Sequence, residues 1–163
     1  SKSYAMTGWR IGDSWTDPEV AKKFTALQSQ ITSNAATPSQ IAALAAYSDE
    51  DAANASLDEM GAAFRRRRDL VVARLKDLLP GAAYVEPGGA FYLYFRVDGF
   101  FDGEVQSATA WCSDLLEQQG VALVPGAAFG DDRWVRLSFA TSDEILEEAF
   151  RRVGAMVGAI STA

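Results

Sequence analysis

The 163-residue chain contains no histidine and only one cysteine, Cys112. The lack of histidine excludes Ser-His-Asp and Cys-His catalysis, and it removes the most common zinc ligand. A single cysteine forms neither a disulfide framework within the chain nor a cysteine-based metal cluster. Any chemistry must therefore depend on lysine, arginine, carboxylates, tyrosine, serine or a cofactor, and we expect no metal site.

Basic residues and long apolar runs are also scarce. The chain has 15 lysines and arginines against 22 aspartates and glutamates, a net charge of −7. This balance argues against non-specific binding to nucleic acid or to anionic membranes. The sequence contains no run of about 18 apolar residues, so it predicts no membrane span. The arginines at 65–68 do not change this view, because successive helical residues point about 100° apart. We expect them to pair in solvent or at a subunit interface.

What the chain does have is enough apolar sequence for a core. Hydrophobic residues make up 48% and aromatic residues 11% of it. Such a chain buries a hydrophobic core without disulfides and is not disordered. The chain begins SKSYAMTGWRIG, without an initiator methionine or a leader, so we expect a fragment or a processed chain.

Residues 1–48 are predicted to be the tail of a larger domain. Apolar residues at helical spacing over 19–31 follow the start signal Asp17-Pro18. Pro38 opens a second helix, whose small and apolar residues predict burial. An extended segment and two helices form no sheet of their own.

Residues 49–163 are predicted to form an α/β layered sandwich, because helical and strand periodicities alternate. Ser48 is the expected N-cap of the first helix, and Thr141 with Glu144 is the expected capping box of the last. The predicted elements are a helix over 49–79 (single, or broken near 54–56), strands at 82–87 and 90–97, a helix at 105–119, strands at 121–125 and 134–140, and a helix at 142–160.

Two cations near the start of the chain are candidates for chemistry. A bend at Thr7-Gly8 would bring Lys2 close to Arg10. A neighbouring cation lowers the pKa of a lysine, which suits an imine-forming amine. The alternative is a surface lysine beside an arginine at the edge of the core.

Arg136 is a second candidate, on a predicted strand. Alternation along 134–140 places Val135 and Leu137 on one face and Arg136 on the other. An arginine on the face away from the aliphatic residues suits either a carboxylate clamp or a structural ion pair.

The string at 1–12 resembles the lysine motif of the class I/II (fold type I) pyridoxal-phosphate aminotransferases, most closely the bacterial aspartate-aminotransferase-like branch. The resemblance covers essentially the whole chain and corresponds to the C-terminal part of that family: the tail of its large cofactor-binding domain and its small C-terminal domain. Further segments that match in order are Thr32-Ser33-Asn34, Phe64 with Arg67-Arg68-Asp69, Gly89-Ala90-Phe91-Tyr92, 120–130 and 135–140.

The resemblance assigns roles to five residues, with pyridoxal 5'-phosphate as the cofactor. Lys2 matches the lysine that forms the internal aldimine and shuttles the proton. Arg10 matches the arginine that holds the cofactor phosphate, and Ser33 matches a serine near the phosphate site of the partner subunit. Arg136 matches the arginine that clamps the substrate α-carboxylate, and Phe91 lines the substrate pocket.

The implied function is transamination between an amino acid and a 2-oxo acid, in a cytoplasmic homodimer. Asp13, Ser14 and Trp15 depart from the family pattern after Gly12. The family residues that contact the cofactor ring precede the lysine, so the resemblance implies an incomplete active site in this chain. Three alternatives remain: a lyase of the same fold, a ligand-sensing domain without catalysis, and a folded but inert remnant.

Overall fold

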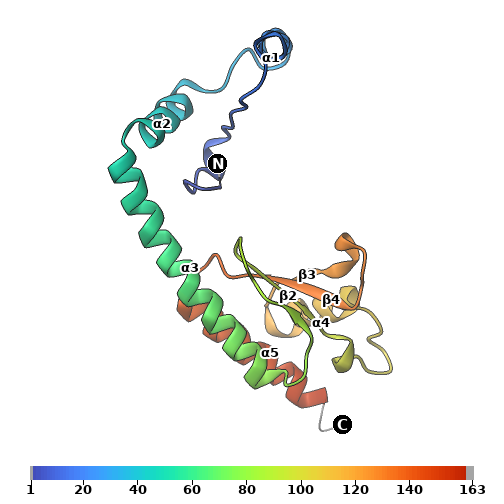
Figure 1. Ribbon diagram of the computed structural model, residues 1–163. Helices are drawn as coiled ribbons and strands as arrows, with labels where there is room; N and C mark the ends of the chain where they lie inside the picture. Colours follow the sequence, from blue (N-terminus) through green and yellow to red (C-terminus); the bar gives the residue numbers. More distant parts are fainter. Residues whose placement is uncertain (1, 161–163) are drawn as a thin grey trace. The chain divides into compact units, whose positions relative to one another are not determined.

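The computed structural model describes residues 2–160, with side chains to residue 158 (Figure 1). It contains helices and one four-stranded sheet, which confirms the predicted α/β class. Two compact units make up the chain, residues 1–61 and 62–163. The long helix α3 (Glu50–Leu78) contributes its first part to one unit and the remainder to the other.

The first unit holds two short helices and a bent N-terminal segment. Asp17 accepts a hydrogen bond from the backbone N–H of Glu19 at 2.9 Å, and Pro18 fills the first helical position, which confirms the predicted start signal. The elements are the 3-10 turn η1 (Thr7–Trp9), α1 (Pro18–Ile31) and α2 (Thr37–Ser48).

Helix α2 holds the N-terminal segment through polar side chains. The Ser39 hydroxyl donates to the Trp9 carbonyl at 2.7 Å, and the Tyr47 hydroxyl donates to the Asp13 carboxylate at 3.0 Å. The ring of Tyr4 meets that of Tyr47 edge-on at 5.7 Å. Asp13, which departs from the family pattern, therefore ties its segment to α2.

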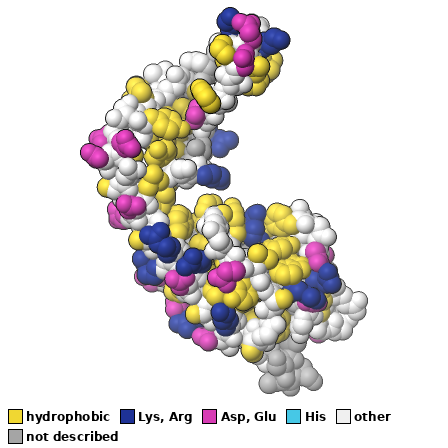
Figure 2. All heavy atoms as spheres, in the orientation of Figure 1, with side chains coloured by type: hydrophobic (Ala, Val, Ile, Leu, Met, Phe, Trp, Pro, Cys, Tyr) yellow, Lys and Arg dark blue, Asp and Glu magenta, His cyan; other side chains and the backbone are white. Residues whose placement is uncertain are grey.

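The prediction that α2 is buried is wrong. Ile41 and Leu44 are 63% and 64% exposed, and Ser39 is the buried residue of the helix. The polar side of α2 packs on the N-terminal segment, so its aliphatic residues face away. Helix α1 also exposes apolar residues, among them Phe24 and Ile31, and Figure 2 shows apolar side chains on the visible surface of this unit.

Helix α3 is continuous, and its N-cap is Asp49 rather than Ser48. The Asp49 carboxylate accepts from the backbone N–H of Ala52 at 3.0 Å. Ser48 closes α2 instead. Asp49 and Ser48 are both good capping residues, and the single-residue link between the helices leaves the role to Asp49.

The second unit is built on an antiparallel sheet in the order β1-β2-β4-β3. The central pair places Leu93 opposite Leu137 and Phe95 opposite Val135, and these four side chains are buried. The strands are β1 (Tyr84–Val85), β2 (Tyr92–Arg96), β3 (Val124–Pro125) and β4 (Trp134–Ser138).

Three helices pack around the apolar face of the sheet. The core joins Leu75 of α3, Trp111 of α4 and Phe150 of α5 to the inward strand residues, and each is at most 2% exposed. Burial of this apolar area is the main stabilising contribution. Helices α4 and α5 span Ala108–Gln119 and Asp143–Ile160.

Both helices have clear end signals. Gly120 ends α4 with a left-handed φ of 67°, as predicted. The predicted capping box at α5 is wrong, because the Ser142 hydroxyl accepts from the backbone N–H of Ile145 at 3.3 Å and acts as the cap. Thr141 lies one residue too early for that contact.

Ion pairs join α3 to α5 within the second unit, where the two helices run side by side (Figure 1). Arg66 and Arg67 both bind Asp143, and Arg74 binds Glu147. Arg68 also binds Asp69, so three of the four successive arginines pair with acids of the same chain. Over residues 2–160, no helix is both long and apolar enough to span a membrane.

Replacing Gly126 by alanine should destabilise the second unit. A Cβ there would lie 2.2 Å from the Asp131 carbonyl oxygen and 2.6 Å from that of Trp134, and backbone atoms do not yield easily. Overpacking of this kind costs about 1–3 kcal/mol of unfolding free energy. Urea denaturation measures it; Gly99→Ala, where a Cβ meets nothing within 4 Å, is the control, and equal stability of both variants would refute this account.

Acid should weaken the second unit in part through Glu148. The guanidiniums of Arg151 and Arg152 lower the pKa of Glu148 to about 2. Because its folded pKa is depressed, its stabilising contribution is present above about pH 4.5 and is lost as the pH falls toward 2. We expect Glu148→Gln to reduce the change of melting temperature with pH across that window. Glu117→Gln, at an exposed position on α4, should keep the pH dependence of the parent chain.

Candidate functional site

The segment that carries Lys2 is a tight, bent structure. The backbone N–H of Ala5 donates to the Lys2 carbonyl at 3.2 Å, and Arg10 donates its backbone N–H to the Thr7 carbonyl. The predicted bend at Thr7-Gly8 is present as the 3-10 turn η1. Lys2 is exposed on this segment.

Arg10 and Ser33 line one cavity of about 830 Å³ in the first unit. They are 23 positions apart in sequence, and the turn after α1 brings them together. Arg10 Nη1 donates to the Thr7 carbonyl at 3.0 Å, which orients the guanidinium. Thr32 and Asn34 add further polar groups to the lining, whereas Lys2 is not among the described lining residues. This cavity therefore has the donors that an anion needs.

Strained backbone marks the same segments. Among residues 2–160, the non-glycine residues with positive φ are Ala5, Arg10, Ser33 and Ala90, at 51°, 53°, 64° and 58°. Left-handed backbone costs an L-residue about 1–2 kcal/mol, and such strain tends to be kept at functional sites. Arg10 and Ser33 are predicted site residues, and Ala90 directly precedes a third, Phe91.

Arg136 lies in the second unit, on the polar face of β4. It is half-buried, and its guanidinium carbon lies 4.3 Å from the ring centroid of Tyr92 and 4.6 Å from that of Phe129. Its backbone pairs within the sheet, but across the described residues, 2–160, its side chain forms no hydrogen bond or ion pair. Its side-chain N–H groups are thus available to a ligand.

The other half-buried arginines of this unit are bound to acids. Arg96 binds Asp98, and Arg152 binds Glu148. Arg67 binds Asp143. Arg136, by contrast, is a half-buried arginine of the sheet whose guanidinium contacts aromatic rings and no carboxylate. A half-buried guanidinium without a carboxylate partner is what an anion-binding site requires.

Phe91 and Arg136 are linked through Tyr92. The Phe91 ring centroid lies 4.6 Å from that of Tyr92 and 5.8 Å from that of Phe64 on α3. Sequence reasoning missed Tyr92 and Phe129 as neighbours of Arg136. Alternation along β2 could have placed Tyr92 on the same face, but Phe129 comes from the irregular turn η3 (Gly126–Phe129), which carries no periodic signal.

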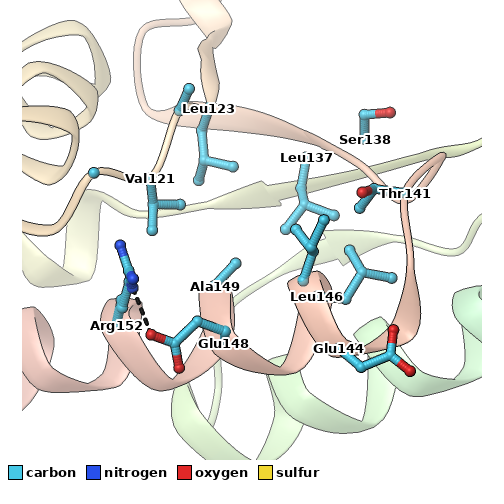
Figure 3. A pocket seen from close by; sticks show the side chains of 13 residues that line it. Val121, Leu123, Leu137, Ser138, Thr141, Glu144, Leu146, Glu148, Ala149 and Arg152 are labelled. Carbon is cyan, nitrogen blue, oxygen red and sulfur yellow. Dashed lines mark hydrogen bonds and ion pairs between the residues drawn. The ribbon is translucent and has the colours of Figure 1, made fainter.

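A different cavity, of about 480 Å³, lies between residues 120–123, β4 and α5 (Figure 3). Val121, Leu137 and Leu146 make it mainly apolar. Its cation, Arg152, already donates to Glu148 at 2.7 Å and to the Gln119 carbonyl at 2.9 Å. None of the predicted site residues lines this cavity, so it is a less suitable place for the chemistry.

Cys112 is not a nucleophile at neutral pH. It is buried on α4 as predicted, and burial raises the pKa of its thiol to about 11. The described residues, 2–160, also hold no group of three or more cysteine, aspartate or glutamate side chains placed to bind a metal ion.

Comparison with known proteins identifies the family. A sequence model described as aminotransferase class I and II matches residues 1–153. The chain belongs to this family. Its members depend on pyridoxal 5'-phosphate, so the resemblance noted in the sequence and the cofactor it implied are confirmed at the level of the family.

Relatives match nearly all of this chain but only part of themselves. An aspartate aminotransferase of Thermotoga maritima is 43% identical over 153 residues, which are 94% of this chain and 37% of the relative. The aromatic aminotransferase structure from Pyrococcus horikoshii has a TM-score of 0.86 and 33% identity, covering all of this chain and 42% of that one. The Thermus thermophilus aspartate aminotransferase with maleate has a TM-score of 0.85 and 38% identity, covering 94% of this chain and 38% of that one.

The residues of the first unit fit this cofactor. Pyridoxal 5'-phosphate carries a phosphate and an aldehyde. The guanidinium of Arg10 and the hydroxyl of Ser33 share a cavity and suit the phosphate, and Lys2 supplies an amine on the same bent segment.

Arg10→Gln should weaken binding of pyridoxal 5'-phosphate at least about tenfold, because hydrogen bonds to charged groups contribute about 1.5–3 kcal/mol. Binding of pyridoxal, which has no phosphate, should change little. Absorbance titration of both ligands measures the effect, with Arg65→Gln on exposed α3 as the control. An equal loss for both ligands would contradict the phosphate assignment.

Proposed function

We propose that this chain supplies the lysine, the phosphate-binding arginine and the carboxylate-binding arginine of a pyridoxal-phosphate-dependent aminotransferase. The reaction moves the amino group of an amino acid to a 2-oxo acid. The donor leaves as its 2-oxo acid, and the acceptor leaves as its amino acid. The chain spans about two fifths of the length of these relatives, 37% and 41% in two cases, and the activity is proposed for the whole protein.

The observation that carries this proposal is Arg136. A carboxylate clamp needs a partly desolvated guanidinium whose N–H groups are not already bonded to an acid. Arg136 meets both conditions, and every amino acid and 2-oxo acid offers the carboxylate that it would bind. Two relatives are named aspartate aminotransferase and aspartate/prephenate aminotransferase, which supports a dicarboxylate as a substrate.

Each residue then has one task. The Nζ of Lys2 would hold the cofactor through its aldehyde group and would carry the proton of the substrate Cα. Arg10 anchors the phosphate, Arg136 fixes the α-carboxylate, and Phe91 shapes the substrate pocket. The cofactor, when bound, supplies the electron sink that makes the Cα proton acidic.

Three further predictions from the sequence belong to this proposal. Residues 1–48 are the remnant of the large cofactor-binding domain, and residues 49–163 are the small domain. The assembly is a homodimer, to which Ser33 contributes near the phosphate of the partner's site. Its location is the cytoplasm. The exposed apolar faces of α1 and α2 support a larger assembly, since such surface favours association.

Reductive trapping tests the role of Lys2. The chain has four lysines: Lys2, Lys22, Lys23 and Lys76. We expect borohydride, added after pyridoxal 5'-phosphate, to fix the label on Lys2 at least about tenfold more than on any other lysine, as read by peptide mass spectrometry. Anchoring of the phosphate by Arg10 raises the local aldehyde concentration at Lys2.

Lys22→Arg is the matched control, because Lys22 is exposed on α1 and paired with Glu19 at 2.8 Å. It should leave the yield unchanged, whereas Lys2→Arg should abolish the preferred label. Even labelling of all four lysines would show that Lys2 is an ordinary surface amine and would overturn its assignment.

A further inference from the structure

Two aromatic residues on the polar face of the second unit's sheet contact the guanidinium of Arg136. Tyr92 comes from β2 and lies two residues before Tyr94, which is the direct neighbour of Arg136 across the strands. Phe129 comes from the end of η3. The guanidinium is thus held from two separate elements, with ring centroids at 4.3 and 4.6 Å from its carbon.

Ring contacts differ from ion pairs in what they leave available. An aromatic face attracts a cation through its quadrupole and does not take up its N–H donors as a carboxylate does. Arg96 on β2 and Arg133 just before β4 form ion pairs with Asp98 and Asp131. Each carboxylate occupies N–H donors of its guanidinium. The rings contact the Arg136 guanidinium without occupying its N–H donors.

The two rings are themselves fixed in place. Tyr92 packs against Phe91 at 4.6 Å, and Phe129 meets Tyr94 edge-on at 6.0 Å. Tyr94 in turn stacks on Trp134 at 5.0 Å. The turn that carries Phe129 starts at Gly126, whose close approach to neighbouring backbone leaves it little freedom. The rings therefore hold the cation in a defined position.

From this geometry we infer that Tyr92 and Phe129 are positioning residues for Arg136. They keep its guanidinium in place over their rings while its N–H groups stay ready for a carboxylate. This inference rests on the proposed role of Arg136. Neither ring needs to touch the substrate, and their effect passes through the arginine.

Solution NMR on the full 163-residue chain tests the inference, with succinate as the probe. The Nε–H signal of Arg136, assigned with Arg136→Lys, should lie upfield of the other arginines because of ring currents, and succinate should shift it in a saturable way. Tyr92→Leu and Phe129→Leu should each move the signal toward its unshifted position. Each should also weaken succinate binding roughly two- to fivefold, as loss of a cation–π contact implies.

Conservative variants and a matched control separate positioning from general damage. Tyr92→Phe and Phe129→Tyr keep the rings and should restore both the signal position and the affinity. Tyr84→Leu removes a ring 5.6 Å from Lys76, a cation–π pair elsewhere in the unit, and should change neither. The indole N–H signal of buried Trp111 reports whether each variant keeps its core, and Phe129, 48% exposed, is replaceable without opening that core.

The outcomes are distinct. If the leucine variants bind succinate as the parent does, or leave the Nε–H signal in place, the positioning role is wrong. If the parent chain shows no response of Arg136 to succinate, the carboxylate role proposed for Arg136 is wrong, and the positioning role falls with it. Weaker binding in the leucine variants with recovery in the ring-preserving variants supports both.

Discussion

The antiparallel pairing of β2 with β4 is the constraint on which the second unit depends. Residues 92–96 lie opposite 138–134, and this register divides the side chains between two faces. One face enters the core, and the other carries the rings and Arg136. A shift of the register by one residue would exchange the faces, burying the Arg136 guanidinium and exposing the aliphatic residues. The register therefore fixes both the packing of the core and the orientation of the arginine.

Much of this arrangement was predictable from period and composition. Alternation placed the side chains of Arg136 and Val135 on opposite faces. The helix start at Asp17 was recognised because Pro18 fixes the first helical position, and the end at Gly120 because glycine favours a left-handed φ. The caps of α3 and α5 were misassigned by one residue, since adjacent residues there are all competent to cap. Burial of α2 was mispredicted because composition shows that a surface is apolar and not what covers it.

The site was predictable only in part. The motif around Lys2 and the facing of Arg136 could be inferred from residue types and resemblance. The strained backbones of Arg10 and Ser33 could not, because a positive φ in a residue other than glycine leaves no mark in the sequence. The contact of Phe129 with Arg136 also depends on an irregular turn, whose path follows from tertiary packing around Gly126.

The state of Cys112 has a practical consequence. Its sulfur lies in the core of the second unit, and at neutral pH it is almost entirely the neutral thiol, which reacts slowly with alkylating reagents. A cysteine introduced at an exposed position would then be the one thiol to take a maleimide dye or a spin label. The parent sequence thus already serves as a background for site-directed labelling.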